Sequence, residues 1–259
     1  MSTIKTLNPL LDLDPTVYAS GFSADSQMRK EAKEKGWSDE QIKEYLAETD
    51  YLGHALGNAK TAVEHILDEC FPERSWYRGF LTGKGNFRHK VATIKPYKGN
   101  RDPNHKPKYY KEIGEYLVHK YGAEVVEGQE ADDMLGIVQW AHPDKSTVIC
   151  SIDKDLKMIP GYHYNPGRKE FFYQTIEDAN LFFLWQMMVG DATDNIPGVA
   201  KVGPKTADKI IAECNGDYRQ IYDRIKDMYA KQYPDYPGAM DEVAELLWMR
   251  RKEGEGPNA

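Results

Sequence analysis

The chain has 259 residues and is 41% hydrophobic, which suits one large globular domain or a core with a smaller appendage. It contains no run of about 18 apolar residues and no apolar signal region at its N-terminus, so we expect neither a membrane span nor export. Its three widely spaced cysteines match no zinc site and indicate free thiols in the cytoplasm.

The net charge of −7 hides a strongly basic stretch. Residues 84–111 contain nine basic residues against the single acid Asp102, so this stretch carries +8 and leaves −15 for the remainder. A polyanion held beside acid clusters that bind metal ions would explain this separation. The simpler alternative is a solvated lysine-rich loop.

The first predicted strand covers residues 7–14 and places Asp12 at its carboxyl end. Ligands of open α/β sheets bind beyond the carboxyl ends of the strands, so an acid there lies where a site is expected. Turn formation or helix capping also accounts for a lone aspartate. Residues 23–71 follow a helical pattern, which we interpret as scaffold.

A second strand is predicted over residues 76–82, and the basic stretch follows it. Its candidate contacts to a nucleic acid are side chains that hold phosphate oxygens or stack on bases: Lys84, Arg88, Tyr97, Lys98 and Arg101. Lys84 lies between two glycines, although the spacing is not that of a P-loop.

The central acid cluster is Glu130, Asp132 and Asp133, at the junction between a strand over 123–126 and a helix. Acids in the first turn of a helix are stabilised by its dipole and its free N–H groups. Three acids within four residues also repel one another, and a divalent cation bound by oxygen ligands would neutralise them.

A further strand is predicted to end in Asp153 and Asp155. Residues two apart in an extended segment face the same side, so we expect both carboxylates to point together. An apolar helix over 181–189 then leads to Asp191 and Asp194.

Residues 199–211 predict a tight turn between two short helices, with Pro204 opening the second. Such a hairpin directs backbone N–H groups and lysines at phosphates without reading bases. The candidate DNA contacts in this hairpin are Lys201, Gly203, Lys205, Thr206 and Lys209. An ordinary helical hairpin is the alternative.

The acids gathered in this way share one chemistry. They are Asp12, Glu130, Asp132, Asp133, Asp153, Asp155, Asp191 and Asp194. Two divalent cations about 3.5–4 Å apart, which clamp an in-line displacement at phosphorus, are the simplest common explanation. Mg²⁺ suits this oxygen-rich set, and Mn²⁺ is a plausible substitute.

The motifs at 130–133, 151–155 and 190–199 resemble, in this order, those of the structure-specific 5′ nucleases. This family includes the phage 5′→3′ exonucleases, the flap endonucleases and the 5′-nuclease domain of bacterial DNA polymerase I. Residues 97–101 are similar to the basic element of the phage members, and residues 196–211 to the family's helix-hairpin-helix.

The resemblance implies an α/β fold, with a mainly parallel central sheet flanked by helices in a PIN-like core over 1–180. A helical subdomain over 181–259 would carry the hairpin at about 190–213. Asp12, Glu130 and Asp132 would hold a first metal, and Asp153, Asp155 and Asp194 a second. Asp133 would lie between them, and Asp191 would act through water. Lys98 and Arg101 would stabilise charge on the scissile phosphate, and K⁺ is a possible ligand of the hairpin carbonyls.

The chain departs from the family pattern in three places. Gly83 replaces the usual aspartate after the second strand, so one ligand is absent or is replaced by water or Asp14. Asp12 is not followed by the usual glycine, which leaves the choice between Asp12 and Asp14 open. Lys201 stands where glycine is common. Few residues separate Arg101 from Glu130 in the sequence, which predicts a short or disordered arch. This arch would lie within a basic region at about 84–111.

The leading hypothesis is a magnesium-dependent 5′→3′ exonuclease and flap endonuclease. We expect it to be phage-encoded, to act on DNA in the cytoplasm of an infected cell and to remove RNA primers beside other replication proteins. A DNA-junction binding protein without catalysis is the alternative, motivated by Gly83. A metal-dependent ribonuclease ranks third because the hairpin favours a duplex.

Overall fold

The computed structural model describes residues 6–102 and 104–257, and a six-stranded sheet lies at its centre. The strand order is β3–β2–β1–β4–β5–β6, in which the first five strands are parallel and β6 is an antiparallel edge. The strands are β1 (Asn8–Asp12), β2 (Arg78–Thr82), β3 (Glu124–Val126), β4 (Thr147–Cys150), β5 (Gly161–Asn165) and β6 (Glu170–Gln174). The expected mainly parallel sheet is confirmed, whereas β5 and β6 were not among the predicted elements.

The central strand β1 is buried along its whole length, as parallel strands covered on both faces are. Leu10 packs into the apolar cluster on one face of the sheet and Leu11 into the cluster on the other. The chain crosses from β1 to β2 on one side, while β4 pairs with β1 on the other. Loops after β1 and β4 therefore diverge, which opens a crevice at their carboxyl ends.

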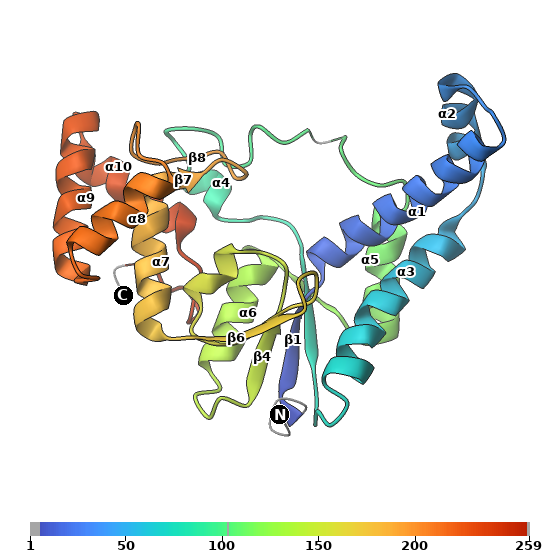
Figure 1. The fold of residues 1–259 in the computed structure, drawn as a ribbon, viewed down its shortest axis with the longest axis horizontal. Coiled ribbons are helices and arrows are strands. Elements are labelled where there is room, and N and C mark those ends of the chain that lie inside the picture. The colour runs from blue at the N-terminus through green and yellow to red at the C-terminus, as the bar shows by residue number, and fades with distance from the viewer. Residues whose placement is uncertain (1–5, 103, 258–259) are drawn as a thin grey trace.

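One side of the sheet is covered by helices that continue into a projecting arm, seen in blue in Figure 1. These helices are α1 (Asp14–Glu34), α2 (Asp39–Glu48), α3 (Leu52–Glu64) with a π-helical turn over His65–Cys70, and α5 (Tyr110–Tyr121). The predicted helical scaffold is confirmed, and Ser38 and Gln41 form the capping box at the start of α2.

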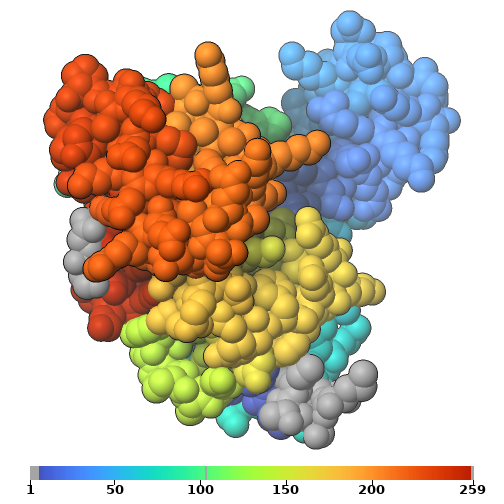
Figure 2. All heavy atoms as spheres, turned by 60° about the vertical axis from the view of Figure 1, so that its left-hand side comes forward, coloured from blue at the N-terminus to red at the C-terminus, as the bar shows by residue number. Residues whose placement is uncertain are grey.

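The remaining helices gather on the opposite side (Figure 1). They are α4 (Arg88–Val91), α6 (Ala131–Trp140), α7 (Ile176–Val189), α8 (Pro204–Glu213), α9 (Tyr218–Gln232) and α10 (Tyr236–Leu247). A single apolar cluster includes Leu10 of the sheet, Phe183 of α7 and Val243 of α10, so the C-terminal helices share the core of the sheet. In Figure 2 the C-terminal helices, in orange and red, lie on one side of the view and the blue arm on the other.

The predicted helix before Pro204 does not form. The two-residue strands β7 (Gly190–Asp191) and β8 (Ile196–Pro197) pair instead, and residues 198–203 continue as a turn into α8. Gly190 permits this hairpin because its φ is 73° and a side chain there would overlap the backbone of Gly198. The helices that flank the hairpin are therefore α7 and α8.

The basic loop over 92–109 links α4 to α5 and passes above the carboxyl edge of the sheet in Figure 1. Its far end is packed, which argues against the disordered one of the two predicted alternatives, a short or a disordered arch. Lys108 Nζ donates to the carbonyl of Leu46 at 2.7 Å and to those of Ala47 and Thr49 at 2.9 Å, at the end of α2. The Tyr109 ring lies 5.0 Å from that of Tyr51, while residue 103 is outside the described residues.

Within the described ranges, no helix has the length and apolar character required to cross a membrane.

Candidate metal and nucleic-acid site

A cavity of about 550 Å³ lies at the carboxyl edge of the sheet. Five acids line it, from β1, α1, the start of α6 and the turn after β4, and two cations of the basic loop line it as well. The acids are Asp12, Asp14, Glu130, Asp132 and Asp153, and the cations are Lys98 and Arg101. The crevice expected from the strand order therefore collects acids that are distant in the sequence.

Three of these acids have no cation bonded to them. Among residues 6–102 and 104–257, no ion pair forms with Asp12, Asp132 or Asp153. Burial, together with the charges of Asp14 and Asp153, raises the pKa of Asp12 to about 8, although the Ser151 hydroxyl donates to it at 2.6 Å. Burial and the charges of Asp12 and Asp153 raise the pKa of Asp132 well above its ordinary value.

Asp14 is held at the end of β2. The backbone N–H of Thr82 donates to both Asp14 oxygens, at 3.1 and 3.2 Å, while Thr82 Oγ1 accepts from the N–H of Ala131 at 2.9 Å. Gly83 cannot supply a carboxylate here without displacement, because its β-carbon would lie 2.7 Å from Glu127 Oε1 and from the Val126 carbonyl oxygen. Asp14 thus brings a carboxylate to the strand end that Gly83 leaves without one.

Glu130 and Asp194 face the basic loop. Lys98 Nζ pairs with Glu130 and lies 3.7 Å from Asp194, and Arg101 also pairs with Asp194. Lys98 has a φ of 55°, so a non-glycine residue holds a left-handed conformation beside the acids. The structure brings both predicted phosphate-binding cations to the acid cluster.

Asp155 and Asp191 share the ammonium group of Lys154, which lies 3.0 Å from each. Burial acts to raise the pKa of Asp191, but the hydrogen bond and charge of Lys154 more than offset it, and the pKa is lowered. The predicted extended arrangement of Asp153 and Asp155 is wrong. β4 ends at Cys150, and the Asp155 N–H donates to Asp153 Oδ1 at 2.8 Å in a turn.

Asp133 and Arg88 lie outside the cavity and require a correction. Arg88 is completely buried and pairs with both oxygens of Asp133, at 2.6 and 2.9 Å. The same carboxylate accepts the backbone N–H of Glu130 at 3.2 Å, which completes a capping box at the start of α6. Arg88 therefore does not reach a nucleic acid, and the Asp133 oxygens are already occupied.

Tyr97 is also not the predicted base-stacking group. Its ring is 4% exposed, and its hydroxyl donates to Glu130 at 2.9 Å and lies 2.8 Å from Asp194. Burial, together with the charges of both carboxylates, raises the pKa of Tyr97. The residue holds the basic loop against the acids.

The predicted duplex contacts of the hairpin lie at the surface. Lys201, Lys205, Thr206 and Lys209 are exposed, and Gly203 is partly exposed at the start of α8. Lys201 has a φ of 64°, which explains why glycine suits this position. Lys84 is likewise exposed, beside the cavity of the acids.

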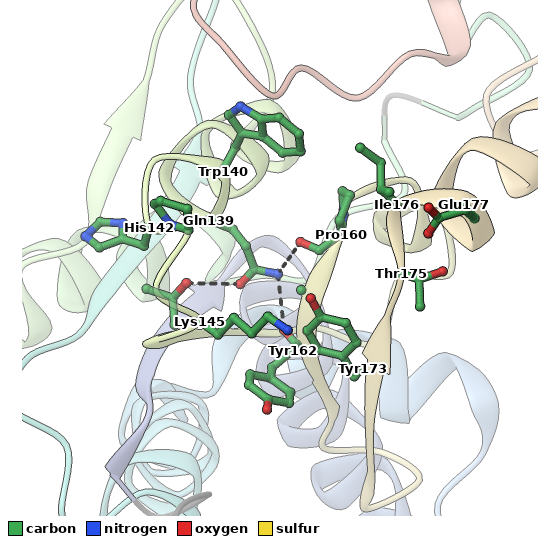
Figure 3. Close-up of a pocket in the computed structure, with 13 residues that line it drawn as sticks. Gln139, Trp140, His142, Lys145, Pro160, Tyr162, Tyr173, Thr175, Ile176 and Glu177 are labelled. Carbon is green, nitrogen blue, oxygen red and sulfur yellow. Dashed lines mark hydrogen bonds between the residues drawn. The ribbon is translucent and has the colours of Figure 1, made fainter.

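A second cavity, of about 580 Å³, lies at the other end of β4 and β5 (Figure 3). Its walls include Trp140, Tyr162 and Tyr173, while the Gln139 amide donates to the carbonyls of Pro160 and Tyr162, both at 3.2 Å. Glu177 is its one lining carboxylate. The larger cavity therefore lacks the clustered charge of the first.

The acids fit a hydrated divalent cation better than a closed protein cage. Among the described side chains, no three His, Cys, Asp or Glu residues are already gathered as a metal-binding group. Mg²⁺ usually keeps several waters and takes one or two carboxylates together with substrate phosphates. Asp132 supports this fit, because its carboxylate is surrounded by other acids and has no bonded partner within the described ranges.

Comparisons with known proteins agree with the motifs. DNA polymerase I of Streptococcus pneumoniae strain R6 is 31% identical over 193 residues, which cover 68% of this chain and 22% of that protein. A 5′-3′ exonuclease of Buchnera aphidicola (Schizaphis graminum) is 28% identical over 193 residues, which cover 67% of this chain and 64% of that one. The chain thus spans about a fifth of the polymerase and under two thirds of the exonuclease. No family model matches it.

Solved structures show the same fold. The flap endonuclease D15 of bacteriophage T5, solved in a complex with DNA and metal ions, aligns with a TM-score of 0.54 at 14% identity. The alignment covers 92% of this chain and 98% of that one. The T5 5′-exonuclease with bound zinc aligns with a TM-score of 0.52 at 16% identity, over 93% and 99% of the two chains. The sequence relatives and the shared fold agree with the resemblance of the motifs to the structure-specific 5′ nucleases.

Proposed function

We propose that the chain is a divalent-metal-dependent 5′→3′ exonuclease and flap endonuclease that hydrolyses phosphodiesters near 5′ ends and junctions. The observation that carries this proposal is the set of unpaired carboxylates, Asp12, Asp132 and Asp153, in one cavity opposite Lys98 and Arg101. A surface that only binds a polyanion gains nothing from buried acids, because like charges repel the phosphates.

The carboxylates divide into two proposed metal sites. Asp12, Glu130 and Asp132 would hold the first ion, joined by Asp14 at the end of β2. The proposed second set is Asp153, Asp155 and Asp194, with Asp191 acting through water. When bound, two Mg²⁺ or Mn²⁺ ions lower the pKa of a water and stabilise the attacking and leaving oxygens. Asp133 is not included, because Arg88 occupies it.

The two loop cations would hold the scissile phosphate. Lys98 and Arg101 already lie against Glu130 and Asp194, so a phosphate that enters the cavity meets donors placed beside the metal-binding carboxylates. Tyr97 fixes this arrangement through its contacts with the same two acids. Charge that develops on the phosphate is then stabilised by groups that are already oriented.

The turn before α8 would grip the duplex away from the cut. Its exposed Lys201, Lys205 and Lys209 suit phosphate contacts, and the N-terminus of α8 favours an anion. We further propose that carbonyl oxygens of this turn bind K⁺. We also propose that the protein has a phage role, in which it removes RNA primers beside replication proteins. The cavity that contains the acids, about 550 Å³ in volume, supports the entry of a phosphate at this edge of the sheet.

The test is single-turnover cleavage of a 5′-labelled flap duplex with Mg²⁺ and with EDTA. Asp132→Asn serves as the comparison, because it removes one charge without changing the size of the side chain. We expect Mg²⁺-dependent release of short 5′ products by the wild-type chain and no release by the variant, with similar DNA binding. Tight junction binding without cleavage, in Mn²⁺ as well, would instead establish the non-catalytic alternative.

A further inference from the structure

The buried ion pair between Arg88 and Asp133 joins three parts of the molecule. Arg88 opens α4, which leads directly into the loop that carries Lys98. Asp133 lies in the first turn of α6, where its carboxylate accepts the N–H of Glu130. The pair is therefore hydrogen-bonded to the backbone of the acid cluster through Asp133, and Arg88 is followed in the chain by the loop that carries Lys98.

The third part is the segment 246–250, which runs from the last turn of α10 into the residues after it. Arg88 Nε donates to the carbonyl of Leu246 at 2.9 Å, and Nη2 donates to that of Trp248 at 2.6 Å. The N–H of Arg250 donates back to Asp133 Oδ1 at 3.2 Å. The Asp133 carboxylate thus accepts from Arg88 and from two backbone N–H groups, while the Arg88 guanidinium also donates to two backbone carbonyls, and neither charged group is in contact with solvent.

The same segment is held by a close approach of backbones. Gly136 of α6 faces Arg250, and a β-carbon at Gly136 would overlap the carbonyl oxygen of Arg250. The Arg250 guanidinium lies 3.9 Å from the centre of the Phe87 ring, and its Nη1 donates to Gln129 at 2.9 Å. The contact is therefore built from a charge pair and from an independent steric fit.

The segment also belongs to the part of the chain that would grip the duplex. α10 packs against α7, α9 and β8, and the strand β8 leads into the turn before α8. Ala207 of α8 lies in the same apolar cluster as Val243 and Leu246 of α10. A shift of the segment 246–250 relative to α6 would thus move the duplex grip relative to the carboxylates.

We propose that Arg88 and Asp133 are positioning residues that fix the distance between the duplex grip and the acid cluster, and so determine which phosphodiester is cut. This inference rests on the proposed nuclease function, because the position of a cut has meaning only if the chain cleaves. The physical reason is rigidity: a buried bidentate pair has one favourable geometry, whereas an uncharged replacement leaves buried donors without partners.

Two variants disturb the contact in different ways. Asp133→Asn removes the charge and keeps the size, and Gly136→Ala pushes the segment away while all charges remain. Glu124→Gln is the matched control for the first, because the Arg78–Glu124 pair, at 2.7 Å, is an exposed pair between β2 and β3. Gly114→Ala is the control for the second, since nothing lies within 4 Å of its β-carbon position.

The readout is the length distribution of 5′ products at single-nucleotide resolution under single turnover. We expect one dominant cut position for the wild-type chain and both controls. In Asp133→Asn and Gly136→Ala the dominant fraction should fall at least twofold as neighbouring positions are cut, with duplex affinity within about twofold. A loss of rate with an unchanged distribution in both variants would overturn the proposal, because a merely structural role predicts that result.

A distance measurement separates this inference from the proposed function. Spin labels at Lys111→Cys in α5 and Lys226→Cys in α9, in a Cys70→Ser background, report the distance between these two helices. The measurement needs no substrate. We expect broader distance distributions in Asp133→Asn and Gly136→Ala than in the controls. If the wild-type chain does not cleave, the nuclease proposal fails. Broadened distance distributions in the two variants would still support Arg88 and Asp133 as positioning residues. Unchanged distributions would overturn that positioning role.

Discussion

Asp14 of α1 and Thr82 of β2 are joined by a backbone N–H shared between the two carboxylate oxygens, at 3.1 and 3.2 Å. A helix residue is thereby fixed at the end of a neighbouring strand, next to Gly83. Burial raises the pKa of Asp14, the Thr82 contact partly offsets this, and the charge of Glu130 adds to the rise. A carboxylate of α1, the helix after β1, thus lies at the end of β2, where Gly83 has none.

Asp14→Asn should weaken metal binding in the absence of DNA. An asparagine oxygen still accepts the Thr82 N–H, so the fold is kept while one negative charge is lost. We expect the affinity for Mn²⁺, measured by titration calorimetry, to fall about tenfold, or ~1.4 kcal/mol. Glu127→Gln is the control, because Glu127 also accepts an amide near this strand end, from Lys84 at 2.8 Å, but does not line the cavity. An unchanged Mn²⁺ affinity in Asp14→Asn would exclude Asp14 as a ligand.

Stability in EDTA should decrease as the pH rises. Burial and neighbouring charges raise the pKa of Asp12 to about 8, far above its ordinary value of 3.8. The folded protein then binds more protons than the unfolded chain between these values, so a contribution present below about pH 4 is lost through about pH 8. Thermal melting in EDTA from pH 5 to 8.5 should show this decline.

Asp12→Asn should flatten that decline and should melt higher than wild type at pH 8 in EDTA. Mg²⁺ should raise the melting temperature of the wild-type chain more at pH 8 than at pH 6, because metal ions compete with protons for the carboxylates. If the melting temperature of the wild-type chain in EDTA did not change between pH 5 and 8.5, burial and mutual repulsion of the acids would not raise the pKa of Asp12.

Lys98→Ala should lower the single-turnover rate by about 10²–10³, as for loss of one electrostatic stabiliser. The ammonium group lies against Glu130 and 3.7 Å from Asp194, so it is placed for the reacting phosphate. Lys95→Ala is the control, because Lys95 is an exposed residue of the same loop and does not line the cavity. Equal rates for the two variants would remove Lys98 from the mechanism.

Two substitutions of Lys201 can distinguish the effect of its backbone conformation on stability from the effect of its charge on duplex binding. Its φ of 64° favours glycine, so Lys201→Gly should be more stable to unfolding by urea than Lys201→Ala by about 1 kcal/mol. Both variants lose the same charge, and both should weaken duplex binding and reduce its salt dependence by about one phosphate contact. A duplex affinity equal to that of wild type would place the turn outside the DNA interface.

The sequence by itself determined the central strands, the helices of the arm and the acids that follow them, but not β5 and β6. The buried runs of β1, β2 and β4 and the helical periodicities of α1–α3 are local patterns, which is why they predict the sheet and its helices. Because parallel strands end at one edge, Asp12, Asp132 and Asp153 were expected to meet, and the cavity contains all three.

Only the tertiary structure decided which of the neighbouring acids faces the cavity. Asp132 and Asp133 are adjacent in the sequence, but successive helical residues point about 100° apart, so one meets the other acids and the other meets Arg88. The sequence does not reveal that Arg88 would be buried by a segment 158 residues away, nor that Tyr97 would turn its hydroxyl to Glu130. Such contacts depend on the packing of distant elements, which local propensity does not encode.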